Sequence, residues 1–263
     1  MASEERFKGS NIVDAGSLSP YWGEHTARYA FALPYVEERS VFDIACGTGY
    51  GISLMANKAE IVVGGDVDIL AAIQAKKECA ENARILLANG LHLPFYDGSF
   101  DVITSFETLE HIDERSAFLS ELSRVLKSDG HLILSTPNAN YTKPVNGKPT
   151  NPFHVFEYTP QELLAELELV FSVESFLGQS LDDSIRIPPF QDAQRRLPND
   201  LLTQSTLFCW KVFNKLPFIV RESLSKAIWR KPFYPTATDY TFLAEQTNSA
   251  PVLVAVCRKK ADK

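Results

Sequence analysis

Glycines follow a short apolar run near the start of the chain and could bring the backbone close to a ligand. The run Val41–Ala45 ends at Cys46, and glycines stand at positions 47, 49 and 51. An apolar run that stops at a glycine cluster is typical of a buried strand entering a tight turn. In α/β sheets, ligands bind where such a strand ends and the next helix begins. We therefore expect a ligand site at this turn.

Two classes of ligand compete for the glycine turn. The dinucleotide fingerprint GxGxxG requires a third glycine at position 52, where this chain has Ile52. A nicotinamide-dependent oxidoreductase is therefore the less favoured interpretation. The other class is S-adenosylmethionine, which a family resemblance implies: Asp66, at the end of the next apolar run, is similar to that family's ribose-binding acid, whose carboxylate can accept hydrogen bonds from both ribose hydroxyls.

Four segments, in order, resemble the motifs of class I S-adenosylmethionine-dependent methyltransferases, in particular the type 11 group. They are Asp43–Gly49, the acid Asp66, the loop Ala88–Phe95 and the segment Ser99–Ile112. The resemblance covers about residues 20–137 and implies S-adenosyl-L-methionine as the cofactor. It also implies a Rossmann-like α/β fold, with a mostly parallel seven-stranded sheet and helices on both faces. Val252–Cys257 would be its antiparallel last strand.

The same motifs imply a set of cofactor-binding residues. Ala45 stands where the family has glycine, and Asn89 stands where it has aspartate, although an amide oxygen can still accept from the adenine amine. Asp43 is expected to orient the amides of the glycine turn. Arg28 is expected to pair with the cofactor carboxylate or to form a surface salt bridge. The full predicted set is Arg28, Asp43, Ala45, Gly47, Gly49, Tyr50, Asp66, Val67, Asn89, Gly90, Leu91 and Phe106.

Residues that follow the later strands could remove a proton from a methyl acceptor. Methyl transfer from a sulfonium is an in-line displacement, and an oxygen or nitrogen nucleophile can require a base. His154 and Glu157 stand three residues apart in a polar and aromatic loop, and His111 follows the fourth expected strand, near Glu107 and Glu110. We predict His154, Glu157 and His111 as catalytic candidates. The alternative is that these side chains only fix their loops.

Strand and helix patterns alternate five times over the first 135 residues, which predicts a parallel sheet with helices on both faces. The expected strands are 40–45, 61–65, 83–88, 100–105 and 131–135. The expected helices are 22–38, broken near Pro34, then 51–58, 69–82 and 114–127, the last closed by Ser128-Asp129-Gly130. Thr159, Pro160 and Glu162 predict a capped helix over 160–169, and a sixth strand is expected at 171–177.

The stretch 179–248 interrupts this pattern and is predicted to be an inserted cap. Residues 1–178 and 249–263 would form the methyltransferase core. Aromatic residues of the cap could bind sugar rings or pack the cap onto the core; they are Trp210, Phe213, Phe218, Trp229, Phe233 and Tyr234. Its basic residues could meet a diphosphate or membrane headgroups, or form a solvated helix face; they are Lys211, Lys215, Arg221, Lys226, Arg230 and Lys231.

Composition excludes several classes of protein. The net charge of −7 argues against a nucleic-acid partner, which needs clustered basic residues. No apolar run is long enough for a transmembrane helix. The four cysteines lack CxxC spacing, which predicts reduced thiols in a cytoplasmic protein and neither a disulfide framework nor a zinc site. We predict no metal site from the sequence.

The acceptor is suggested by two weaker resemblances. Glu24–Tyr29 and Asn151–Val155 are similar to methyltransferases found with bacterial polysaccharide and glycan biosynthesis. They imply a small-molecule or glycan acceptor, such as a sugar hydroxyl or a sugar on a nucleotide or lipid carrier, methylated at oxygen or nitrogen. The alternatives are a non-catalytic protein that keeps the fold as a binding module or scaffold, and a nucleic-acid methyltransferase.

Overall fold

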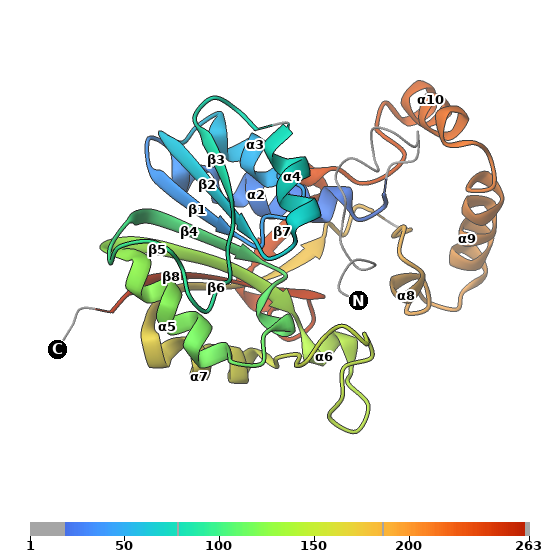
Figure 1. The fold of residues 1–263 in the computed structure, drawn as a ribbon. Coiled ribbons are helices and arrows are strands. Elements are labelled where there is room, and N and C mark those ends of the chain that lie inside the picture. The colour runs from blue at the N-terminus through green and yellow to red at the C-terminus, as the bar shows by residue number, and fades with distance from the viewer. Residues whose placement is uncertain (1–18, 78, 186, 261–263) are drawn as a thin grey trace. The chain divides into compact units, whose positions relative to one another are not determined.

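A mixed sheet with helices on both faces forms the larger part of the protein (Figure 1). The computed structural model describes residues 19–77, 79–185 and 187–260. The sheet order is β3-β2-β1-β4-β5-β8-β6-β7. Its strands are β1 (Ser40–Ile44), β2 (Ile61–Asp66), β3 (Ala83–Leu87), β4 (Phe100–Phe106), β5 (Leu126–Pro137), β6 (Phe171–Leu181), β7 (Tyr240–Leu243) and β8 (Val252–Lys259).

Strands β1 to β5 are parallel, and β8 runs antiparallel between β5 and β6, as predicted for Val252–Cys257. The sheet contains eight strands among the described residues, so the expected number of seven is wrong. The additional strand, β7, has four residues at the sheet edge. So short a segment carries too few alternating apolar positions to stand out in the sequence.

The helices of the described chain follow the strands in sequence. The longer ones are α2 (Trp22–Val36), α3 (Tyr50–Ala56), α4 (Ile69–Lys77), α5 (Arg115–Val125), α7 (Pro160–Val170), α9 (Leu201–Phe213) and α10 (Phe218–Trp229). The short ones are η1 (Leu109–His111), α6 (Ala139–Thr142), α8 (Gln191–Gln194), η2 (Ala237–Asp239) and η3 (Ala244–Gln246).

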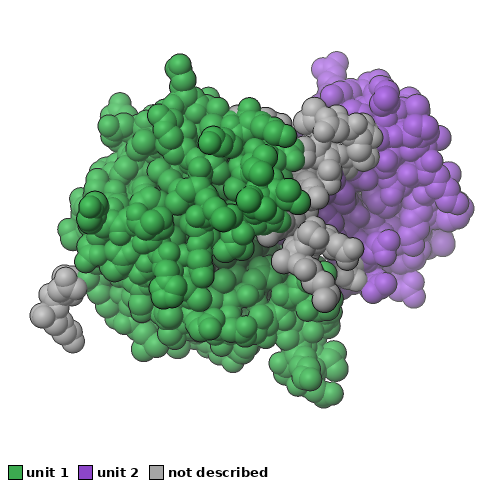
Figure 2. Space-filling view, in the orientation of Figure 1, with its two compact units in different colours: residues 1–7, 28–180, 242–263 green, residues 8–27, 181–241 purple. Residues whose placement is uncertain are grey.

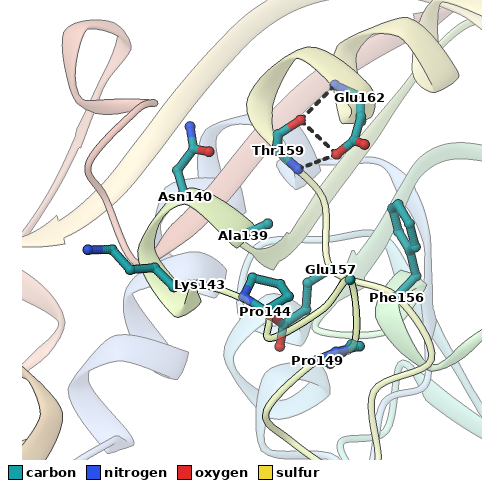
Figure 3. Close-up of a pocket in the computed structure, with 10 residues that line it drawn as sticks. Ala139, Asn140, Lys143, Pro144, Pro149, Phe156, Glu157, Thr159 and Glu162 are labelled. Carbon is teal, nitrogen blue, oxygen red and sulfur yellow. Dashed lines mark hydrogen bonds between the residues drawn. The ribbon is translucent and has the colours of Figure 1, made fainter.

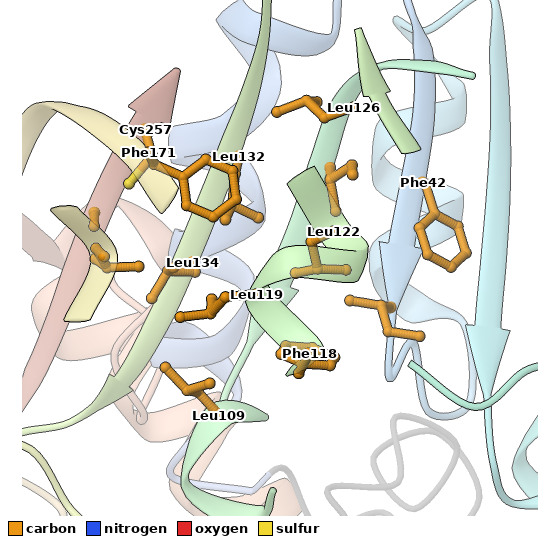
Figure 4. Close-up of a cluster of buried hydrophobic side chains, with 14 of the residues drawn as sticks. Phe42, Leu109, Phe118, Leu119, Leu122, Leu126, Leu132, Leu134, Phe171 and Cys257 are labelled. Carbon is orange, nitrogen blue, oxygen red and sulfur yellow. The ribbon is translucent and has the colours of Figure 1, made fainter. Parts of the chain in front are cut away.

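Buried apolar side chains form a cluster on each face of the sheet, because neighbouring residues of a strand point to opposite faces. On β5, Leu132 and Leu134 belong to the cluster that α5 and α7 cover, which Figure 4 shows. Ile133, between them, belongs to the cluster that contains residues of α2 and α3. Helices therefore bury both faces, as a parallel sheet requires.

Two predicted helix ends differ from the structure. Helix α2 continues past Pro34 to Val36, because a proline in the last turn removes only one intrahelical hydrogen bond. Ser128–Gly130 do not close α5, which ends at Val125; they lie within β5, where the pairing with β4 shifts register. A Cβ at Gly130 would lie 2.8 Å from the Asp101 carbonyl oxygen, so the glycine permits a close approach of two strands.

The predicted start of α7 is confirmed in detail. The Thr159 hydroxyl accepts a hydrogen bond from the Glu162 amide, and the Glu162 carboxylate accepts one from the Thr159 amide. Dashed lines in Figure 3 mark this pair, and Pro160 occupies the first helical turn. The helix therefore begins where its capping residues specify.

The chain divides into two compact units, which Figure 2 colours separately. The described residues of unit 1 are 28–77, 79–180 and 242–260, and those of unit 2 are 19–27, 181–185 and 187–241. Within unit 2, Phe233 packs against Trp210, Phe213 and Tyr234, with ring centroids 4.9 to 6.1 Å apart. Among the described residues, no helix is both long and apolar enough to cross a membrane.

Candidate active site

The carboxyl ends of the parallel strands gather the predicted functional residues of unit 1 at one edge of the sheet. From β1 the chain moves outward to β2 and β3, and then crosses back to β4 and β5 on the other side. The ends of β1 and β4 therefore flank a topological switch point, where open α/β sheets bind ligands. The strand ends, the turn after β1 and the loops after β2 to β5 supply most of the side chains described below, and α2 supplies Arg28 and Tyr29.

The glycine turn between β1 and α3 has an unusual backbone. Ala45, Gly47 and Gly49 have φ angles of 58°, 56° and 85°, all in the left-handed region. A Cβ at Gly49 would also lie 2.8 Å from that of Ala75 on α4. Ala45 is the one residue of the three that has a Cβ. A glycine would suit this position better, because a Cβ is unfavourable at a left-handed φ angle.

Asp66, at the end of β2, is joined to the glycine turn. Its carboxylate accepts hydrogen bonds from the amides of Gly47, at 2.9 Å, and Asp68, at 2.8 Å, and its side chain is buried. Asp68 caps the next helix, since its carboxylate accepts from the Leu70 amide at 2.6 Å. Val67 is exposed. Asp66 thus brings a carboxylate to the turn while it holds the turn's backbone.

Asp43 lies beneath the turn, and its predicted role differs from its contacts. It accepts hydrogen bonds from the Thr104 hydroxyl at 2.6 Å and the Tyr29 hydroxyl at 3.1 Å, and not from the amides of the turn. Complete burial raises the pKa of Asp43 to about 7, although both hydrogen bonds oppose this shift. The pairing of β1 with β4 places Asp43 opposite Thr104. The sequence does not contain this strand register, so the contact could not be predicted from it.

Aromatic rings surround Tyr29 at the same edge. Tyr50 and Phe106 meet its ring edge-on, with centroids 5.3 and 4.9 Å away. Burial and the neighbouring Asp43 raise the pKa of Tyr29. These contacts give the two predicted residues, Tyr50 and Phe106, a packing role beside the turn.

Arg28 is buried, so the alternative of a surface salt bridge is wrong. Its guanidinium donates to the Gln179 side chain at 2.9 Å and lies 3.9 Å from the Glu107 carboxylate. A buried cation held in this way costs little further desolvation when an anion approaches it. The prediction that Arg28 pairs with a cofactor carboxylate stays a prediction.

The loop after β3 contains the residues predicted to contact adenine. The Asn89 amide oxygen accepts from the Leu91 amide at 3.0 Å, which leaves one lone pair of that exposed oxygen for a ligand. Gly90 is buried, and a Cβ there would lie 2.4 Å from the Phe118 ring. The loop is thus fixed by its own hydrogen bond and by packing on α5.

The loops after β4 and β5 bring His111 and His154 together. Their ring centroids lie 4.9 Å apart, nearly edge to face. His154 Nδ1 lies 2.7 Å from a Glu157 carboxylate oxygen, and its Nε2 lies 3.0 Å from the Asn151 amide nitrogen. His111 Nδ1 lies 2.9 Å from the Phe153 carbonyl oxygen. The three predicted catalytic candidates therefore form one cluster.

Glu110 joins this cluster and was not among the predicted catalytic residues. One carboxylate oxygen accepts from the Thr136 hydroxyl at 2.9 Å, and the other lies 4.0 Å from His111 Nε2. Burial and the negative charge of Glu107 raise the pKa of Glu110 well above its usual value. The Glu110 carbonyl also accepts from the Val155 amide at 2.8 Å, which ties the two loops together. A buried glutamate has no signature in the sequence, so only the fold identifies it.

Glu157 also forms part of the wall of a surface cavity of about 430 Å³, shown in Figure 3. Besides His154, its carboxylate accepts from the Thr142 hydroxyl. Other residues that line the cavity are Ala139, Asn140, Lys143 and Phe156. A second cavity, of about 470 Å³, lies at the opposite edge of the sheet and contains none of the predicted site residues.

Residues 42–134 match a family model that is described as a methyltransferase domain. A probable S-adenosylmethionine-dependent methyltransferase of Mycobacterium tuberculosis is 32% identical over 160 residues, which are 60% of this chain and 58% of that protein. A probable methyltransferase of the same kind from Mycolicibacterium smegmatis is 35% identical over 174 residues, or 65% of this chain and 66% of the relative. The matched region thus spans less than two thirds of these relatives.

More distant relatives cover more of the chain. A ubiquinone/menaquinone biosynthesis C-methyltransferase of Shewanella is 26% identical over 72% of this chain and 75% of its own length. An S-adenosylmethionine-dependent methyltransferase from Mesorhizobium loti has a TM-score of 0.54 and 16% identity over 92% of this chain and 98% of its own. The cyclase SpnF has a TM-score of 0.59 and 17% identity over 91% of this chain and 82% of its own. These structures show a shared fold.

Proposed function

We propose that this protein, whose residues 42–134 form an S-adenosylmethionine-dependent methyltransferase domain, methylates an oxygen or nitrogen of a small-molecule or glycan acceptor. The acceptor we favour is a sugar, free or linked to a carrier, in bacterial polysaccharide biosynthesis in the cytoplasm. One observation carries the proposal. The glycine turn with Asp66 and the cluster of His111, His154 and Glu157 occupy the same edge of one sheet.

The residues of the turn fit the cofactor that the domain implies. The position of a Cβ at Gly47 has no other atom within 4 Å, so a ligand can approach the backbone there. Asp66 would accept from the ribose hydroxyls, and the loop Asn89–Leu91 would face the adenine. When bound, S-adenosyl-L-methionine supplies a methyl group already activated on a sulfonium. The protein's own task is then to align the acceptor and to receive its proton.

His154 is the residue we assign as the general base. Its Nδ1 faces the buried carboxylate of Glu157 at 2.7 Å, which favours the Nδ1-protonated tautomer. Nε2 faces the Asn151 amide nitrogen at 3.0 Å, and it would accept the proton of an acceptor that takes the place of this contact. Glu157 is itself held by Thr142, so the pair is oriented from both sides. His111 packs edge-on against His154 and positions it. Such a pair serves a nucleophile that carries a proton, which supports a hydroxyl or amine acceptor.

The segment 179–248 is proposed as the region that handles the acceptor or its carrier. Helices α9 and α10 of unit 2 expose large apolar side chains, including Phe208, Ile219 and Trp229, which are 67%, 72% and 59% exposed. Lysines and arginines in and beside these helices make this segment basic in an acidic protein. Apolar and basic side chains together favour weak contact with an anionic membrane surface, where a lipid carrier would lie.

The first test is calorimetric titration of the purified protein with S-adenosylhomocysteine and, separately, with NADH. We expect micromolar binding of the first and none of the second. Binding of NADH alone would contradict the proposal. Transfer of labelled methyl groups is then measured on nucleotide sugars, lipid-linked sugars and a quinone precursor. Methylation of the quinone alone would favour a carbon acceptor, as in the Shewanella relative, over the sugar acceptor.

A further inference from the structure

One atom each of Glu110, His111 and His154 lies within 4.8 Å of the others. Two imidazoles and one carboxylate form a common ligand set for divalent first-row metals. From this geometry we propose that Glu110, His111 and His154 bind a divalent transition-metal ion, of the Mn²⁺ or Zn²⁺ type. The sequence predicted no metal site, because His111 and His154 stand 43 residues apart and show no ligand spacing.

The hydrogen bonds around the cluster place the proton of each imidazole on Nδ1, so Nε2 is the atom of each ring that could bind a metal ion. His111 Nδ1 is opposite the Phe153 carbonyl oxygen, which accepts only, so Nδ1 carries the proton and Nε2 is free to bind metal. His154 Nδ1 faces the Glu157 carboxylate, so its Nε2 is the ligand atom by the same argument. A carbonyl or carboxylate behind each imidazole is the usual outer shell of a metal-binding histidine.

The carboxylate of Glu110 is oriented in the same manner. Thr136 donates to one oxygen, while the other is buried and has no hydrogen-bond partner among the described residues. A buried carboxylate oxygen without a partner is costly, and a bound cation would remove that cost. This oxygen is the one that lies 4.0 Å from His111 Nε2.

Metal binding requires one local change. The Asn151 amide nitrogen, which lies 3.0 Å from His154 Nε2, must give up this contact to the ion. Asn151 is only partly buried, so its side chain can rotate without opening the core.

Occupancy of this site does not depend on the proposed function, but its role does. Three protein ligands leave open positions at a divalent ion, and a hydroxyl bound there loses its proton more easily. His154 Nε2 cannot hold an ion and a proton together. With the ion bound, His154 would therefore act as a ligand, and the ion would replace it in activating an acceptor hydroxyl.

The test is metal binding by the full chain after treatment with a chelator. We expect one Mn²⁺ or Zn²⁺ per chain by equilibrium dialysis with elemental analysis, at least ten-fold tighter than Mg²⁺. The variants His111→Asn and Glu110→Gln should each weaken this binding at least ten-fold. His111 is 36% exposed, so its replacement leaves no cavity even if Glu110→Gln fails to fold. His131→Asn is the control, because His131 contacts Glu174 outside the cluster. This variant should bind the metal ion as tightly as the wild type.

Any of the following outcomes would overturn the metal site. One is that no ion is retained at micromolar concentration. The other is that an ion binds equally well to the wild type and to His111→Asn, or that Mg²⁺ binds as tightly as Mn²⁺ and Zn²⁺. S-adenosylhomocysteine is titrated into the same samples. Its binding without metal binding would overturn only this inference, and metal binding without it would contradict only the proposed function.

Discussion

The candidate site has two halves, one at the ends of β1, β2 and β3 and one at the ends of β4 and β5, and they are built in different ways. In the half formed by β1, β2 and β3, the backbone makes the site: three alternate residues, Ala45, Gly47 and Gly49, have left-handed φ angles, and the Asp66 carboxylate holds the amide of Gly47. In the half formed by β4 and β5, side chains make the site. His111 and His154 come from loops far apart in sequence and meet through Glu110 and Phe153.

This difference teaches how each half should respond to substitution. A backbone-built site tolerates a change of side chain unless that change alters the turn or removes the carboxylate that reaches the ligand. A site built from convergent side chains loses its chemistry when one of them is removed, while the fold and the other half remain. The predictions below test this contrast, from the largest expected effect to the smallest.

His154→Ala should lower methyl transfer by about 10² to 10⁴-fold, because it removes the imidazole that receives the acceptor's proton or holds the ion. S-adenosylhomocysteine affinity, measured by calorimetry, should stay at the wild-type value, since the cofactor half is intact. His131→Ala, a histidine outside the cluster, serves as control. Wild-type turnover in His154→Ala would remove this residue from the site.

Asp43→Asn should flatten the dependence of stability on pH. The pKa of Asp43 is about 7 in the folded protein and about 3.9 in an unfolded chain, so the folded state binds the proton more tightly. Its contribution to stability is therefore complete below about pH 4 and is lost as pH rises through about 7, at up to ~1.4 kcal/mol per pH unit. Urea unfolding at pH 5, 6, 7 and 8 measures this loss in the wild type and the variant. If the free energy of unfolding changed equally with pH in the wild type and the variant, the raised pKa of Asp43 would be contradicted.

Asp66→Ala should weaken S-adenosylhomocysteine binding by ~1.5–3 kcal/mol, because the ribose loses a charged acceptor. The variant also frees the Gly47 amide, so the whole turn loosens. Asp68→Ala is the matched control: it removes a helix cap two residues away and should cost about 1 kcal/mol of stability with affinity unchanged. Equal affinity of Asp66→Ala and the wild type would exclude Asp66 from the cofactor site.

Ala45→Gly should raise the free energy of unfolding by ~0.5–1 kcal/mol. The substitution removes the Cβ from a residue with a left-handed φ angle and so removes backbone strain. This gain is partly offset by the greater conformational freedom of glycine in the unfolded chain. Ala56→Gly, at the end of α3 in ordinary helical conformation, should change stability in the opposite direction. Chemical denaturation measures both. A loss of stability in Ala45→Gly would show that the turn is not strained at this position.

Local patterns in the sequence were sufficient for much of this protein. The alternation of strands and helices, the glycine turn, and the capping residues Thr159 and Glu162 all act over a few neighbouring residues, and each appears in the structure where it was predicted. The half formed by β1, β2 and β3, where we propose that the cofactor binds, lies within this local range. The strand that sequence patterns missed, β7, is short and lies at the sheet edge, and Ser128–Gly130 form an irregular part of a strand although their residue types favour a turn.

Contacts between distant segments were decided only by the tertiary structure. Asp43 meets Thr104 because β1 pairs with β4 in one register, and Glu110 joins His111 and His154 because the loops after β4 and β5 end at adjacent strands. Strand order and register arise from the packing of both faces of the sheet, which no window of the sequence contains. The sequence alone therefore determined most strands and helices of the sheet and the glycine turn, whereas the fold decided which buried charges and imidazoles converge.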